Sequence, residues 1–307
     1  MADLSIGQRL DRRVLRKGFN AGWPLLALQL IEARRVAAQP AAYLAARRNA
    51  RELLATSSWS AFITRDSGYR LFSGDTFPEA PTIVTACQNV YARHADKIGR
   101  MPVNKPYFYN ILTEDDLRAH PILTEFALSA AVTEAVAGYL GQVPRLHSLG
   151  VFYSAVSGSI DGSQMYHVDG DALNQVKCFI NVWDVGPGGG GLTFFPKTLT
   201  SRPLRHGGLL KTLKDSDVYR TIPETHAVVA SGPPGSGAFV DTSRCLHQGS
   251  RAPERPRLVF QFQYVPRPDT LPAYAVKRVV PGGHLHVSRS LLKGFKFSNP
   301  SALMFVD

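Results

Sequence analysis

The segment YHVDGD, residues 166–171, places a histidine and an acid two positions apart, just before a glycine. In a strand that enters a turn, residues i and i+2 project on the same side, so His167 and Asp169 can bind one metal ion together. Such pairs also occur by chance. The competing interpretation is a turn in which Asp169 and Asp171 accept backbone hydrogen bonds. A calcium loop fits less well, because DGDALNQV lacks the spaced acids and final Glu of an EF-hand.

A third ligand for the same ion is expected from His247, which precedes a late strand in the run TSRCLHQGSRAPERPRLVF. Two histidines and one carboxylate on one face, with the other coordination positions open, are typical of non-haem iron(II) oxygenases. Two competing histidines, His206 and His226, fall in the segment 197–236 and are expected to be surface or lid residues.

An anion-binding residue is expected ten positions after His247, where Arg257 begins the strand RLVFQFQYV. The strand alternates between two faces. One face carries Arg257, Val259, Gln261 and Gln263, and the other carries Leu258, Phe260, Phe262 and Tyr264. We expect the aromatic face to pack under helices. The arginine then faces the interior, where a buried guanidinium needs an anion.

These residues resemble the phytanoyl-CoA dioxygenase-like family of Fe(II)/2-oxoglutarate oxygenases. The resemblance rests on QMYHVDGD (164–171), on VKCFINVWDVGPGGGGLTFFP (176–196), and on His247 and Arg257. It covers roughly residues 144–266 and, more weakly, 105–141. After Pro196 the family often continues Gly-Ser-His, whereas this chain has Lys-Thr-Leu.

The resemblance implies a double-stranded β-helix (jelly-roll, cupin-like) core and iron bound by His167, Asp169 and His247. It also implies 2-oxoglutarate as cosubstrate, chelating the iron and pairing its distal carboxylate with Arg257, a match that suits a guanidinium fork. In the family, O2 splits the cosubstrate into succinate and CO2, and an unactivated C–H bond of the substrate is hydroxylated. Halogenating relatives lack the carboxylate that Asp169 provides, so we expect a hydroxylase acting on a small or medium-sized metabolite. Desaturation and ring closure stay open.

Further cosubstrate contacts are expected from three polar residues: Gln164, Asn181 and Ser250. Gln164 is equally well explained as an ordinary strand residue. The competing arginines are less suitable anion ligands than Arg257. Arg244 and Arg251 flank the His247 loop and are expected to face solvent or substrate, and Arg255 precedes Pro256, outside the strand.

The predicted fold class is α+β and mainly β, with N-terminal helices packed on one sheet. Residues 59–290 are predicted to form one double-stranded β-helix domain, with its core in 144–266 and a lid or insertion in 197–236. Residues 1–58 are predicted to form a basic helical segment, and residues 291–307 a C-terminal tail.

After Pro144, short segments rich in β-branched and aromatic residues are bounded by Gly and Pro, which is typical of a sandwich or barrel. These predicted strands are 149–156, 177–185, 192–196, 237–243 and 257–265. Earlier strands are expected at 69–72 and 107–112. A helix is expected at 124–140, with Thr124 as its N-cap and Gly141 just past its end.

Composition limits the partners of this 307-residue chain, which is 44% hydrophobic. Its cysteines, Cys87, Cys178 and Cys245, form no CxxC pair, which favours a reducing compartment, and we expect Cys245 to be a packed small residue. The net charge of +11 is concentrated before Glu52. No zinc-finger spacing, basic zipper or RNP-like run accompanies it, so nucleic acid is not an expected partner.

Localisation is expected to be cytoplasmic. The run WPLLALQLI, residues 23–31, is too short to span a bilayer, and basic residues follow it in place of a signal cleavage site. The basic helices are interpreted first as a solvated face, with peripheral contact to anionic lipid or an anionic substrate as the second interpretation. The alternative functions are a jelly-roll binding module without iron and a membrane-surface protein.

Overall fold

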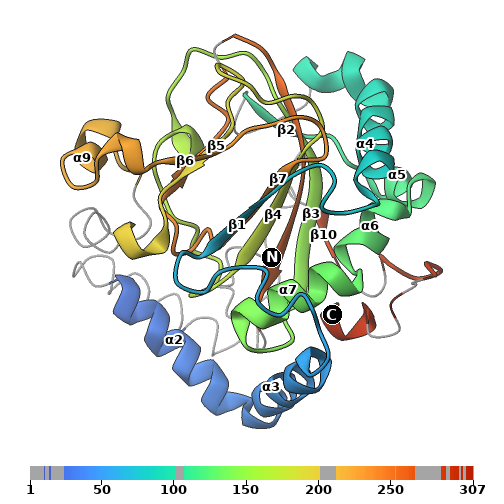
Figure 1. Ribbon diagram of the computed structural model, residues 1–307, viewed down its shortest axis with the longest axis vertical. Coiled ribbons are helices and arrows are strands. Elements are labelled where there is room, and N and C mark those ends of the chain that lie inside the picture. The colour runs from blue at the N-terminus through green and yellow to red at the C-terminus, as the bar shows by residue number, and fades with distance from the viewer. Residues whose placement is uncertain are drawn as a thin grey trace.

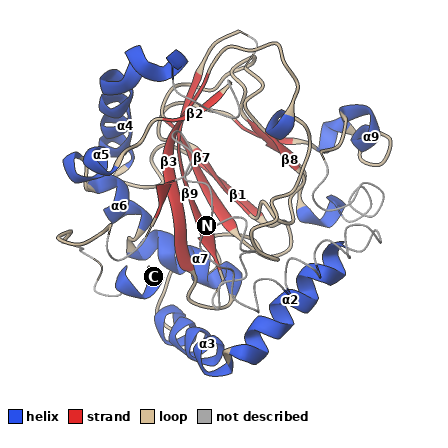
Figure 2. Ribbon diagram, turned by 180° about the vertical axis from the view of Figure 1, so that it is seen from behind, coloured by secondary structure: helices blue, strands red, loops and turns tan. Residues whose placement is uncertain are grey.

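Two antiparallel sheets and a set of helices make up the part of the chain that the computed structural model describes (Figure 1). The described residues are 10, 14, 24–100, 107–200, 212–252, 254–266, 285–287, 291–296, 299 and 302–306. Figure 2 shows α4, α5 and α6 along one side of the strands, with α2 and α3 across one end.

The described helices, including the short 3-10 helices labelled η, are α2 (Pro24–Ala38), α3 (Pro40–Leu54), α4 (Ala80–His94), η1 (Ala95–Arg100), α5 (Glu114–Ala119), α6 (Ile122–Ala127), α7 (Ala130–Leu140), η2 (Gly162–Gln164), α9 (Asp215–Tyr219), η3 (Glu224–His226) and η4 (Ala302–Phe305). The strands are β1 (Tyr69–Phe72), β2 (Phe108–Asn110), β3 (Arg145–Ser154), β4 (Val176–Asn181), β5 (Leu192–Phe194), β6 (Val228–Ala230), β7 (Gly237–Val240), β8 (His247–Gln248), β9 (Arg257–Val265) and β10 (Leu285–His286).

Strand order identifies the fold. The larger sheet runs β1-β7-β4-β9-β3-β10, with β2 also paired to β3, and the smaller sheet runs β6-β5-β8. An isolated bridge between His167 and His247 adds the segment around residue 167 to the edge of the smaller sheet. From β3 onward the chain passes back and forth between the two sheets. The strands β3, β4, β7 and β9 lie in the large sheet. The segment around residue 167 lies between β3 and β4 in the chain, β5 and β6 lie between β4 and β7, and β8 lies between β7 and β9; all of these belong to the small sheet. This is the double-stranded β-helix that the sequence predicted.

The alternation predicted for β9 is confirmed. Leu258, Phe260, Phe262 and Tyr264 belong to the core that the helices cover. The rings of Phe262 and Phe126 of α6 meet edge to face at 6.0 Å, and the Tyr264 hydroxyl donates to the Ala127 carbonyl. Burying an aromatic side chain of this kind contributes roughly 2 kcal/mol. The helices therefore fix which face of β9 looks into the space between the sheets.

The helix predicted at 124–140 is two helices, and Thr124 is not its N-cap. Thr124 lies inside α6, which ends at Ala127. Ser129 then caps α7 by accepting a hydrogen bond from the Val132 N–H, because a serine hydroxyl satisfies a free amide at a helix start. The prediction for Gly141 is confirmed: its φ of 70° closes α7, and its N–H donates to the Ala137 carbonyl.

Four predicted strands are shorter than expected. The segment 107–112 forms β2 at Phe108–Asn110, and the segment 192–196 forms β5 at Leu192–Phe194. The segment 177–185 forms β4 only to Asn181, and Val185 instead makes an isolated bridge to Gly232. The segment 237–243 forms β7 only to Val240, because the Asp241 side chain accepts hydrogen bonds from the Ser243 N–H and hydroxyl and organises a turn. A carboxylate that bonds its own backbone two residues on favours a turn over a ladder.

The basic segment and the predicted lid are described in part. Most of residues 1–23 lie outside the described residues, as do 201–211, which include His206. Helix α3 packs on the main domain, with Ala46 and Ala50 buried and the Ala46 carbonyl accepting from Val143 N–H. No helix among the described residues is long and apolar enough to cross a bilayer.

Candidate metal centre

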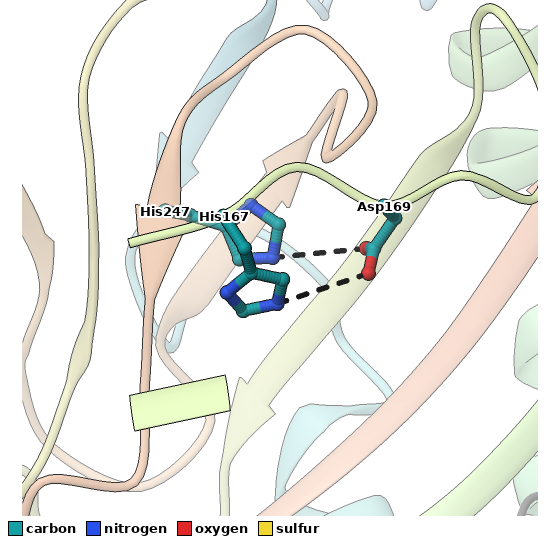
Figure 3. Close-up of side chains that lie close together, drawn as sticks. All are labelled: His167, Asp169 and His247. Atoms are coloured by element: carbon teal, nitrogen blue, oxygen red, sulfur yellow. Dashed lines mark ion pairs between the residues drawn. The ribbon is translucent and has the colours of Figure 1, made fainter. Parts of the chain in front are cut away.

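Backbone pairing between two distant segments brings the predicted ligands together. The His167 N–H donates to the His247 carbonyl at 2.8 Å, and the His247 N–H donates back to the His167 carbonyl at 2.9 Å. Residues paired in this way project on the same side of the ladder, and the two ring centroids lie 4.3 Å apart (Figure 3). Asp169 is fixed by its own N–H, which donates to the Thr242 carbonyl at 2.9 Å.

The donor atoms of His167, Asp169 and His247 all lie within 4.8 Å of one another. His167 Nε2 is 3.9 Å from Asp169 Oδ1, and His247 Nε2 is 3.7 Å from Asp169 Oδ2. These separations are too long for hydrogen bonds. They fit three ligands around one ion, since atoms each about 2.1 Å from a metal lie roughly 3–4 Å from one another.

Both imidazoles are oriented by the carbonyl group two residues before them. His167 Nδ1 lies 2.9 Å from the Met165 carbonyl oxygen, and His247 Nδ1 lies 3.0 Å from that of Cys245. A carbonyl only accepts, so each Nδ1 carries the proton and each Nε2 presents its lone pair to the shared space. Burial, with the neighbouring His167, lowers the pKa of His247 to about 3, which keeps this ring neutral at physiological pH.

A lysine that the sequence analysis did not single out contacts the predicted aspartate. Lys177 on β4 places Nζ 2.8 Å from Asp169 Oδ2. Burial favours a higher pKa for Asp169, but the Lys177 ammonium, which also donates a hydrogen bond to this carboxylate, outweighs burial and holds the pKa well below its usual value. Asp169 is therefore a carboxylate. The available signal was the alternation of β4, which puts Lys177 on the same face as Phe179.

Arg257 is 4% exposed and faces the space between the sheets, as predicted from the alternation of β9. Its Nη1 donates to the Gly190 carbonyl at 2.6 Å, and its Nε has no hydrogen-bond partner among the described residues. Burial lowers the pKa of Arg257 to about 10, so the guanidinium stays charged at neutral pH. Gly190 has a φ of 68°, and a Cβ there would meet the Arg251 backbone at 2.9 Å.

One pocket joins these groups. Its lining residues are Phe108, Ser163, His167, Asp169, Lys177, Phe179, Leu192, His247, Gly249, Ser250, Arg257 and Gln261. Three apolar side chains line it beside the convergent polar groups, a combination found in small-molecule sites. The pocket can hold a metal ion at the His167 end and an anion at the Arg257 end.

No family model matches the chain, and no curated protein sequence matches it. Solved structures resemble it weakly. The non-haem α-ketoglutarate-dependent carbocyclase SnoK from nogalamycin biosynthesis is 15% identical, with 75% of this chain and 93% of that chain covered and a TM-score of 0.49. EctD from S. alaskensis with bound Fe is 18% identical, with 69% and 76% covered and a TM-score of 0.46.

HygX from Streptomyces hygroscopicus, solved with nickel and 2-oxoglutarate, is 13% identical, with 75% of this chain and 97% of that chain covered and a TM-score of 0.47. Because these TM-scores lie below 0.5, we base the fold and the site on this chain's own strand order and side chains.

Of the three additional cosubstrate contacts predicted, the structure places Ser250 in the pocket lining. Its φ of 62° is unusual for a residue with a Cβ, and its hydroxyl accepts a hydrogen bond from Ser154 at 3.1 Å. This position beside the strand of His247 and near Arg257 keeps Ser250 as a candidate.

Gln164 and Asn181 are not among the pocket-lining residues, and their predicted cosubstrate contacts stay predictions. Gln164 is fully buried, donates to the Ser250 carbonyl at 2.9 Å and accepts from the Asp161 N–H at 3.1 Å. Asn181 donates to the Ser236 hydroxyl at 3.2 Å. Both amides brace loops around the site, because a buried polar side chain must satisfy its hydrogen bonds.

The arginines and the histidine that were weighed against Arg257 and His247 either form other hydrogen bonds or are exposed. Arg251 forms two parallel hydrogen bonds with Asp215 of α9, at 2.6 and 2.7 Å, and Arg244 donates to Asn174 at 3.3 Å. Arg255 and His226 are exposed. Cys245 is buried, as predicted.

Proposed function

We propose that this chain is an Fe(II)- and 2-oxoglutarate-dependent oxygenase of the cupin-like superfamily. It hydroxylates an unactivated C–H bond of a small or medium-sized metabolite, with succinate and CO2 as co-products. The observation that carries the proposal is the convergence of two imidazole Nε2 atoms and one carboxylate at a single point. Two histidines and a carboxylate on one face, with the remaining positions open, suit non-haem iron(II).

The residues present fit that ion. His167 and His247 would hold it through Nε2, with the carbonyls of Met165 and Cys245 fixing each ring, and Asp169 would supply the carboxylate. Neutral imidazoles and one carboxylate leave coordination positions for a chelating cosubstrate and O2. When bound, the ion with its cosubstrate and O2 supplies the oxidising power for the C–H bond. The presence of Asp169 supports hydroxylation over halogenation.

Arg257 would bind the distal carboxylate of 2-oxoglutarate. A buried guanidinium needs a counter-anion, and Arg257 Nε has no partner among the described residues. Charge-assisted pairing of a guanidinium with a carboxylate is bidentate and strong away from water. Arg257 is itself 4% exposed, so little water competes for this contact. Ser250 lies in the pocket wall, where its hydroxyl can contact the cosubstrate.

An anaerobic titration of the metal-free protein with Fe(II) and 2-oxoglutarate tests the proposal by the visible charge-transfer band of the chelate. The wild-type protein and the His226→Ala control, which changes an exposed histidine, should develop the band. His167→Ala should not. Arg257→Ala should need about 10- to 100-fold more 2-oxoglutarate, the loss expected for a hydrogen-bonded charge pair.

A folded wild-type protein that takes up no iron would overturn the proposal and favour a jelly-roll binding module. Full turnover by His167→Ala, Asp169→Ala or His247→Ala would equally sink it, because each of these side chains would then be dispensable.

A further inference from the structure

Lys177 is a charged residue in the pocket that the proposed function uses neither to bind the metal nor to bind 2-oxoglutarate. It lies on the inner face of β4, 8% exposed, and it lines the pocket. Among the described residues, the carboxylate of Asp169 is the only group to which its ammonium donates a hydrogen bond. An ammonium has three N–H donors, so two remain for other acceptors.

Metal binding would weaken the one contact that Lys177 has. A divalent ion held by His167, Asp169 and His247 neutralises the carboxylate that Lys177 now contacts at 2.8 Å. The same ion repels an ammonium at short range, and the repulsion is strong where water is excluded. In the loaded site the Lys177 ammonium therefore gains from a different anionic partner.

The charges of the loaded pocket lead to the same conclusion. Asp169 and the two carboxylates of 2-oxoglutarate match the divalent ion and Arg257 in charge. As metal ligands His167 and His247 would be neutral imidazoles, and the described pocket lining has no other acid than Asp169. The Lys177 ammonium is then the one positive charge in this count without a negative counterpart. An uncompensated buried charge is costly, so the complete site accommodates one further negative group.

This group would lie apart from the one that binds Arg257. Lys177 pairs in register with Gln263 of β9, and Phe179 pairs with Gln261. Arg257 lies six residues from Gln263 on the same strand, which is roughly 20 Å along the backbone. The two cations therefore reach the pocket from points far apart along the sheet, with Phe179 between them in the strand register.

We propose that the substrate carries one oxyanion group, a carboxylate or a phosphate, and that Lys177 binds it beside the metal. The inference rests on the proposed function, since the charge count includes the iron and 2-oxoglutarate. Phe108, Phe179 and Leu192 in the pocket wall would contact the apolar part of such a substrate.

The test uses protein loaded with Co(II), which stands in for iron, and 2-oxoglutarate, with benzoate, benzamide and phenyl phosphate as probes. Calorimetry measures each affinity. Benzoate should bind the wild-type complex at least about ten-fold more tightly than benzamide, because only the anion forms a charge-assisted contact. Phenyl phosphate binding more tightly than benzoate assigns the site to phosphates, and the reverse order assigns it to carboxylates.

Variants locate the contact. Lys177→Met should bind benzoate and benzamide equally, and Lys177→Arg should keep the preference. Lys97→Met, the same change at an exposed lysine, should behave like the wild type. The wild-type comparison stands even if Lys177→Met does not fold.

Equal affinities in the wild-type complex, or a preference that persists in Lys177→Met, would overturn this inference alone. Failure of Co(II) and 2-oxoglutarate to bind would instead overturn the proposed function, and this inference with it.

Discussion

Two clusters in this molecule pair histidine with aspartate, and they differ in how fully the carboxylate is bonded. At the end of α4, His94 Nε2 lies 2.8 Å from Asp116 Oδ2, which also accepts from the Thr113 N–H and hydroxyl at 3.0 and 2.6 Å. Arg93 donates to the other oxygen at 3.1 Å. In the pocket, Asp169 accepts one hydrogen bond from the described residues, that of Lys177.

Unused hydrogen-bonding capacity separates a ligand site from a structural cluster. Asp116 is saturated by direct hydrogen bonds that close the capping box of α5, so it has no capacity for a ligand. The imidazoles of His167 and His247 instead stop 3.9 and 3.7 Å from Asp169. Their Nδ1 atoms are held by carbonyls, so the lone pairs of Nε2 converge on an open point.

Affinity for a metal ion should differ most between the two clusters. His247→Ala should lose at least about 100-fold in affinity for Co(II), because losing a ligand costs more than losing an outer-shell partner. His94→Ala should keep the wild-type affinity. Calorimetry on the metal-free proteins measures both. A His94→Ala protein that loses affinity, or a His247→Ala protein that keeps it, would contradict the distinction.

The second prediction concerns the stability that the Asp116 cluster contributes to the fold. Asp116→Ala should lower the free energy of unfolding by about 3 kcal/mol, since it leaves His94 and Thr113 without their buried partner. Glu114→Ala removes an exposed ion pair on the same helix and should cost less than about 1 kcal/mol. Urea unfolding at pH 7 compares the two. Equal losses would show that Asp116 is no more important than a surface acid.

The third and smallest change is in how the stabilisation by Asp116 depends on pH. Burial favours a higher pKa for Asp116, but hydrogen bonds from Thr113 and His94 outweigh it, so the pKa lies below its usual value. The folded protein then binds this proton less tightly than the unfolded chain. The stabilisation is complete above about pH 4, the unfolded pKa, and is lost as the pH falls through the folded pKa.

The difference in thermal unfolding temperature between the wild-type protein and Asp116→Ala should therefore decrease as the pH falls from 5 to 2. Thermal unfolding followed by circular dichroism at several pH values measures it. A difference that stays constant over this range would show that Asp116 does not carry the effect.

Local patterns predicted much of the fold. The strict alternation of RLVFQFQYV predicted β9 to the residue, because side chains two apart share a face in any strand. The helix predicted at 124–140 is divided, because the Ser129 hydroxyl inside it accepts from the Val132 N–H and begins a new helix.

The candidate site was predictable to the extent that its ligands follow a spacing. His167 and Asp169 are two residues apart, His247 precedes a late strand, and Arg257 begins that strand ten residues later. The family resemblance implied the same four residues. The partners of Gln164 were not predictable: its side chain reaches the Ser250 carbonyl, 86 residues away. A hydrogen bond between distant segments leaves no periodicity in either one.

Local patterns were enough to show that His167 and Asp169 share a face, that Arg257 lies on the inward face of β9, and that the chain is rich in strands after Pro144. Backbone geometry fixes these relations within a few residues. The pairing of His167 with His247, the orientation of both rings toward Asp169 and the contact of Lys177 with the same carboxylate appear only in the folded chain. These depend on the register between segments up to 80 residues apart, which the packing of the whole fold sets.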